Sequence, residues 1–166
     1  MARRKSLVIS DEQMRVIDGV LAKLRRVTGS RFVALVSTSG QPITTDPPES
    51  DTDTLSLGAL AAGSFAATRQ LAEVLKEREF SLLFHEGKES NLHVVQVSER
   101  ILLLITFGRD TQVGKVRLFT GRAVEVLKPI FERAEEITGD EIIVDGDYST
   151  EAGSALEAWF PVDAED

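Results

Sequence analysis

Apolar residues recur at helical spacing in two stretches of the chain, one near each end. The first stretch covers residues 11–28 and predicts an amphipathic helix. Ser10 and Gln13 fit a capping box at its start, and Gly29 is placed to end it. The apolar residues of this predicted helix are Met14, Ile17, Leu21 and Leu24.

The second stretch predicts a long amphipathic helix over residues 116–134. Its apolar positions are Val116, Phe119, Ala123, Val126, Leu127, Ile130, Phe131 and Ala134. Pro129 lies inside this stretch, where a proline removes one helical hydrogen bond and its ring crowds the preceding turn. We therefore expect a kink or a break near Pro129.

Five shorter stretches between these helices have the composition of β-strands. They cover residues 31–37, 41–45, 80–85, 91–97 and 100–107. The second contains Pro42, which favours a position at the edge of a sheet. The fifth is almost continuously apolar, as expected for a strand that is buried on both faces. Helices should therefore cover both faces of the sheet.

A central helix is predicted over residues 54–78, after a Pro- and Asp-rich loop that caps it. One stripe of this helix holds Leu57, Leu60, Ala61, Ser64, Ala67, Thr68, Leu71, Val74 and Leu75, and the other holds Ala59, Ala62, Gly63, Ala66 and Gln70. Residues 54–68 carry no charge, whereas a surface helix normally has a charged outer face. Either the helix is buried on both sides within its own chain, or its outer face packs against a second protein.

The order of elements, α-β-β-α-β-β-β-α, predicts an α+β domain with an antiparallel sheet over residues 10–138. Residues 1–9 are expected to form a disordered basic N-terminus. Residues 139–166 are expected to form an acidic tail with a short amphipathic helix. The net charge of −8 is concentrated late in the chain, since residues 134–166 hold eleven acidic side chains and no lysine or arginine. Such a distribution argues against binding a nucleic acid backbone.

No residues form a self-contained catalytic or metal-binding motif. Cysteine is absent, and the longest apolar run is far too short to insert into a membrane, so we expect a cytoplasmic protein. Residues 108–115 resemble a phosphate-binding loop, but the glycine spacing is one residue too long and Val116 replaces the required Ser or Thr. An enzyme that uses His85 and Glu86, or the carboxylates of residues 46–53, is a weaker alternative to a binding module without cofactor or metal.

The order of the predicted elements and the residues of the central stretch resemble the Roadblock/dynein light chain family over positions 12–136. Within that family they are most similar to the bacterial MglB-type regulators. The resemblance is carried in order by Leu57, Leu60, Ala62, Gly63, Ala66, Ala67, Leu71, Ala72, Phe80, Phe84–Gly87, Phe107 and Gly114–Arg117. It implies a three-layer α/β/α fold whose five-stranded antiparallel sheet continues across a homodimer. The central helix covers one face of that sheet, and the terminal helices cover the other.

The resemblance also implies a function. MglB-type dimers bind the Ras-like small GTPase MglA in its GTP form and stimulate hydrolysis without an arginine finger, in bacterial cell polarity and gliding motility. The alternatives are a non-catalytic scaffold that binds a GTPase or motor complex, and promotion of nucleotide exchange through the tail. The implied GTPase contacts are Ala59, Ala62, Gly63, Ala66, Arg69 and Gln70. Those of the tail are Leu156, Trp159 and Phe160, and those of the dimer are Phe80, Leu82, Phe84, Ala67 and Leu71.

Overall fold

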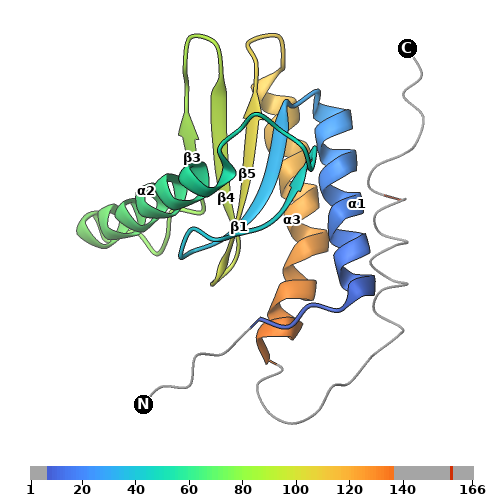
Figure 1. The fold of residues 1–166 in the computed structure, drawn as a ribbon. Coiled ribbons are helices and arrows are strands. Elements are labelled where there is room, and N and C mark those ends of the chain that lie inside the picture. Colours follow the sequence, from blue (N-terminus) through green and yellow to red (C-terminus); the bar gives the residue numbers. More distant parts are fainter. Residues whose placement is uncertain (1–6, 137–157, 159–166) are drawn as a thin grey trace.

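The computed structural model describes residues 7–136 and Ala158, and within them the predicted order of elements is confirmed (Figure 1). Three helices alternate with five strands. They are α1 (Asp11–Thr28), β1 (Phe32–Ser37), β2 (Pro42–Asp46), α2 (Thr54–Leu75), β3 (Leu82–His85), β4 (Asn91–Ser98), β5 (Ile101–Phe107) and α3 (Val113–Glu136). The predicted disorder of residues 1–9 and the predicted tail helix around Leu156, Trp159 and Phe160 fall almost wholly outside the described residues.

The five strands form one antiparallel sheet in the order β2-β1-β5-β4-β3. The apolar strand β5 is therefore central, with Leu103 opposite Leu35 of β1 on one side and Val95 of β4 on the other. The strand that contains Pro42 lies at one edge, as predicted, and β3 lies at the other edge. The sheet thus has two ends of different composition.

Side chains of the sheet alternate between two cores, because successive residues of a strand point to opposite faces. Leu103 and Ile105 of β5 belong to the core under α1 and α3, whereas Leu102 and Leu104 belong to the core under α2. Figure 1 shows α1 and α3 on one face and α2 on the other. This arrangement is the predicted three-layer α/β/α fold.

The two terminal helices follow their sequence signals with one exception. Ser10 and Gln13 form the predicted capping box, and Gly29 ends α1 in the left-handed conformation. The predicted break at Pro129 is wrong, because α3 runs without interruption from Val113 to Glu136. Leu127, Ile130 and Phe131 surround Pro129 and are fully buried. Their packing offsets the loss of one helical hydrogen bond.

Candidate functional site

Helix α2 begins at a cap that the loop before it supplies. The Asp53 carboxylate accepts a hydrogen bond from the backbone N–H of Ser56, with a donor–acceptor distance of 3.1 Å. Hydrogen bonds from Ser56 to the carboxylate lower the pKa of Asp53 below its usual value. Asp53 therefore stabilises the start of the helix as an anion, which is the capping role expected of this loop.

Two glycines hold the first turn of α2 against the β1–β2 turn. A Cβ atom on Gly58 would lie 2.8 Å from the carbonyl oxygen of Gly40 and 3.3 Å from Cγ1 of Val36. A Cβ on Gly40, whose φ is 88°, would lie 2.7 Å from the Cα of Ala59. The backbones touch at this point, so any side chain larger than hydrogen would push the helix away from the sheet.

The inner face of α2 is built from small residues around one aromatic anchor. Phe65, 2% exposed, packs with Phe32, Val94 and Leu104 of the sheet. The other buried positions of the helix are Gly58, Ala61, Ala62, Thr68 and Ala72.

The predicted stripes of α2 therefore need a correction. The pattern groups Ala62 with Ala59, Gly63, Ala66 and Gln70, and the family resemblance implies that it contacts the GTPase, but Ala62 is 7% exposed and belongs to the chain's own core. Phe65 belongs to neither predicted stripe. The spacing Gly58, Ala61, Ala62, Phe65, Thr68, Ala72 carries the correct signal. Larger leucines elsewhere on the helix obscure it, because they look like better core residues.

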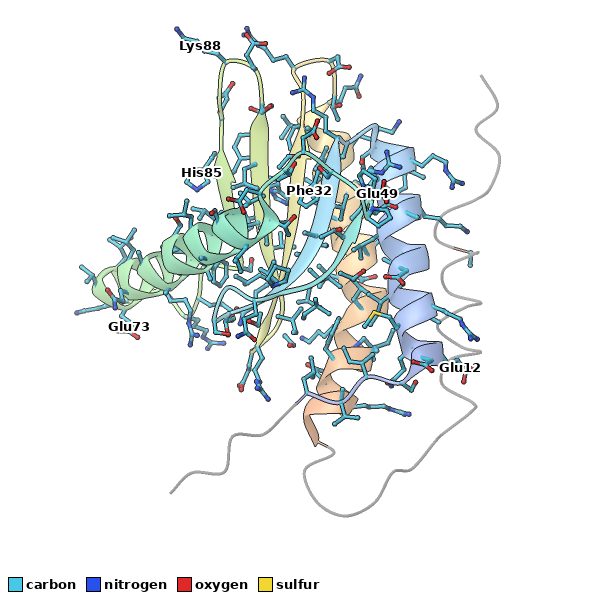
Figure 2. All side chains as sticks on the ribbon, in the orientation of Figure 1. Glu12, Phe32, Glu49, Glu73, His85 and Lys88 are labelled. Carbon is cyan, nitrogen blue, oxygen red and sulfur yellow. The ribbon has the colours of Figure 1, made fainter. Side chains whose placement is uncertain are left out.

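The outer face of α2 exposes apolar side chains in a continuous band. Leu60 is 71% exposed and Val74 is 78% exposed. The helix carries only two charges, Arg69 and Glu73, and Figure 2 shows Glu73 near the far end, directed away from the sheet. The other large apolar residues that α2 leaves exposed are Leu55, Leu71 and Leu75. Contiguous apolar surface of this kind is typical of a protein interface.

Strand β3 presents an open edge beside this band. It pairs with β4 alone, so the other side of its backbone has no partner strand among the described residues. Figure 1 shows that α2 crosses the face of the sheet near β3 and that its C-terminal half extends beyond this edge. The exposed apolar band and the open strand edge together form the candidate functional site.

Apart from the buried Ala62, the described site residues that were predicted are either exposed or half-buried. Ala59, Gly63, Ala66, Arg69 and Gln70 are exposed, and so are Ala67, Leu71 and Leu82 of the predicted dimer contacts. Phe80 is half-buried. Phe84 is half-buried too, with its ring centre 6.2 Å from that of Phe107 and 6.4 Å from that of His93, in the core under α3. Leu60 and Val74 are prominent in the band but were missed as site residues.

The residues considered for catalysis do not assemble into an active site. His85 is exposed at the end of β3, pointing away from the sheet in Figure 2, whereas His93 is buried with no hydrogen-bond partner for its Nδ1 atom. Burial, assisted by the nearby charge of Arg117, lowers the pKa of His93 to about 4. Among the described residues, no three His, Asp or Glu side chains cluster as metal ligands.

The loop that resembles a phosphate-binding site is already filled by side chains. A Cβ on Gly108 would lie 2.6 Å from Nη2 of Arg31 and 2.5 Å from Oδ1 of Asp110. These two side chains lie directly against Gly108. Within the part of the chain that the structure describes, no helix combines the length and apolar character needed to span a bilayer.

Comparison with known proteins shows which family and which solved structures this chain is similar to. The Roadblock/LC7 domain model matches residues 16–107. Among solved structures, MglB of Myxococcus xanthus is 36% identical, with a TM-score of 0.67 over 70% of this chain and 95% of that one. The gliding protein MglB of Thermus thermophilus is 29% identical, with a TM-score of 0.69 over 80% and 99%. An MglB with a tetrameric arrangement is also 29% identical, with a TM-score of 0.70 over the same shares. A search of curated protein sequences gives no match.

Proposed function

The chain belongs to the Roadblock/LC7 family, and we propose that it is a homodimeric regulator of the MglB type. In this proposal it binds a Ras-like small GTPase of the MglA type in the GTP form and stimulates GTP hydrolysis, within a bacterial polarity or motility system. The observation that carries the proposal is the exposed apolar band of α2 beside the open edge of β3. A surface of this kind is costly to leave in water and needs partners.

The outer face of α2 carries two parallel lines of residues, and we assign one line to each of two partners. Successive residues of a helix are turned by about 100°, so Ala59, Gly63, Ala66 and Gln70 share one line, and Leu60, Ala67, Leu71 and Val74 share the next. The second line holds the larger apolar side chains and ends beyond the edge of the sheet. We assign it, together with β3, to the homodimer, because burial of large apolar side chains stabilises a permanent interface.

The first line fits the GTPase. Its alanines and glycine are exposed, and a Cβ on Gly63 would meet no atom within 4 Å. A backbone from another protein can therefore approach the helix closely along this line. In a two-fold dimer the two copies of the line lie on one assembly, so one GTPase can contact both protomers.

Stimulation in this scheme requires no residue of the regulator to enter the reaction. Arg69 lies at the edge of α2, next to the core-facing residues and away from the middle of the small-residue line. The proposed regulator instead binds one conformation of the GTPase more tightly and so raises its population. A second contact through Leu156, Trp159 and Phe160 remains part of the proposal.

The decisive experiment is single-turnover GTP hydrolysis by the MglA-type GTPase of the same source, with and without this protein. We expect stimulation by the wild-type chain. In Ala66→Arg, the added side chain blocks close approach, so the concentration needed for half-maximal stimulation should rise about tenfold or more. The matched control is Glu132→Arg on α3, which adds positive charge on the opposite face of the sheet and should stimulate normally.

Two outcomes would contradict the proposal in different ways. GTP-dependent binding without faster hydrolysis would show a scaffold. Equal stimulation by the wild type and by Ala66→Arg would exclude the small-residue line of α2 as the docking surface.

A further inference from the structure

A groove on the outer face of α3, opposite to the α2 side, has no part in the proposed function. Arg117, Leu118, Gly121, Arg122 and Glu125 line it from α3. The remaining lining residue is Ala158, which lies far along the sequence and is the single described residue of the C-terminal segment. Ala158 therefore borders this groove.

The groove combines an exposed apolar residue with unfilled space. Leu118, in the second turn of α3, is 54% exposed on the side of the helix away from its packed face. A Cβ on Gly121, three residues later, would meet no atom within 4 Å, and the same holds for Gly114, four residues before Leu118. A glycine in a helix interior costs about 1 kcal/mol relative to alanine. Nothing in the packing of the domain explains that cost at Gly121.

Charge favours an acidic segment in this place. Along residues 113–133, five side chains are basic and two are acidic. Arg117 and Arg122 lie in the groove itself, and Arg122 also stacks on the ring of Phe119, with 5.3 Å between the guanidinium carbon and the ring centre. Residues 137–166, which follow α3, in contrast hold nine acidic side chains and no lysine or arginine.

The chain is also long enough to return to this place. From Gly121 to the end of α3 at Glu136 the helix covers about 22 Å. The roughly 22 residues from Glu136 to Ala158 can span about 70 Å when extended. Because the segment is tethered to the same chain, its effective concentration at the groove is in the millimolar range, about what a short flexible linker provides.

We infer that the groove on α3 is a docking site for the chain's own C-terminal segment, with Leu156, Trp159 and Phe160 packing over Leu118 and Gly121. Glu157, next to Ala158 in sequence, is then held near the arginines of the groove. The space above Gly121 accommodates an aromatic side chain that a larger residue at this position would exclude.

Docking has a consequence for regulation. While the segment lies on α3, its three apolar side chains are withheld from any other partner. A GTPase that uses them must first compete with the groove, which reduces the apparent affinity of the tail contact to its intrinsic value multiplied by the undocked fraction. This consequence rests on the proposed function, whereas docking does not.

Tryptophan fluorescence of the free, full-length chain tests docking, because Trp159 is the only tryptophan. The experiment compares acrylamide quenching in the wild type, Leu118→Asp and Lys128→Asp without any GTPase. Leu118→Asp removes the apolar contact and brings a negative charge to the groove. Lys128→Asp introduces the same residue at an exposed position outside the lining and changes the charge of α3 by a larger amount.

We expect Trp159 to be shielded in the wild type and in Lys128→Asp, and to be quenched about three- to tenfold more strongly in Leu118→Asp. Both substituted side chains are exposed, and circular dichroism should confirm that all three proteins are folded. Equal, strong quenching in all three would show that the segment is not docked. Equal shielding in all three would show that Trp159 is buried elsewhere, and either result overturns the assignment.

Discussion

The two faces of the sheet are covered in opposite ways. On one face, α1 and α3 contribute large side chains, and fully buried residues such as Leu24, Leu127 and Phe131 fill the core. On the other face, α2 contributes alanines, a glycine and the single large anchor Phe65. Leu57 packs partly against this core, whereas Leu55, Leu60, Leu71, Val74 and Leu75 are exposed. The helices on one face bury their large side chains within the protomer, and the helix on the other face leaves its large side chains exposed.

This difference separates the residues that stabilise the fold from those that the proposed function assigns to binding. A protomer that only had to fold would gain stability by turning Leu60 or Val74 inward. The close approach of α2 to the sheet excludes this arrangement, because the backbones at Gly40 and Gly58 already touch. The small inner residues therefore keep the large ones available on the outside.

The largest contrast is expected between Phe131→Ala and Leu71→Ala. Phe131 is fully buried, so its truncation should lower the free energy of unfolding by about 3–5 kcal/mol at any protein concentration. Leu71 is mostly exposed, so its truncation should leave the protomer folded and weaken the dimer by about tenfold. Denaturant unfolding and analytical ultracentrifugation over a range of concentrations separate the two effects.

A loss of folding stability in Leu71→Ala at concentrations where the protein is monomeric would break this comparison. It would mean that α2 is also needed as a complete core element of the isolated protomer.

Two glycines of α2 provide a second, smaller contrast. In Gly58→Ala the added methyl meets the Gly40 carbonyl oxygen, and we expect a loss of about 1–3 kcal/mol. In Gly63→Ala the methyl meets nothing, so the monomer should be unchanged or gain up to about 1 kcal/mol of helix stability. Thermal unfolding of the monomeric protein measures both. Equal effects of the two substitutions would contradict the assignment of inner and outer faces.

The smallest expected effect is the change in folding stability with pH that arises from the buried His93. Burial lowers the pKa of His93 to about 4, against 6.5 for an ordinary histidine, so the unfolded chain takes up the proton first as pH falls. The stability that the neutral ring contributes is complete above about pH 6.5 and is lost between pH 6.5 and 4. From about pH 7.5 to about pH 5.5 we expect a loss of about 1 kcal/mol.

Urea unfolding at these two pH values tests the assignment to His93. His93→Gln should remove this part of the pH dependence, whereas His85→Gln, at an exposed position on the neighbouring strand, should retain it. Persistence of the full pH dependence in His93→Gln would assign it to other groups.

The fold could be predicted from the sequence because its signals are local and agree with one another. The capping box at Ser10, the apolar run of β5 and Pro42 at the edge each report on a short segment, and each prediction was confirmed. Pro129 misled the prediction because tertiary packing of its neighbours decides the outcome there. A single-residue propensity does not contain that information.

The site was predicted less well, for a physical reason. The lack of charge on α2 left open whether the helix is buried on both sides or packs against a second protein, and the rotation of the helix depends on how closely it approaches the sheet. That approach is set by Gly40, which lies in another part of the chain. Ala62 was therefore placed outside and Phe65 overlooked, although Ala59, Gly63, Ala66 and Gln70 were placed correctly on the exposed surface.

The unequal ends of the sheet limit how far copies of this chain can add to one another. At the β2 end, Pro42 cannot donate a backbone hydrogen bond, the β1–β2 pairing is irregular next to Leu35, and α1 holds the strand through Asp18 to Thr44 and Arg25 to Asp46. Only the β3 end remains suited to strand pairing. In the proposed dimer, pairing through β3 uses the one sheet edge suited to it among the described residues, so the sheet would end at two copies and would not grow into fibres.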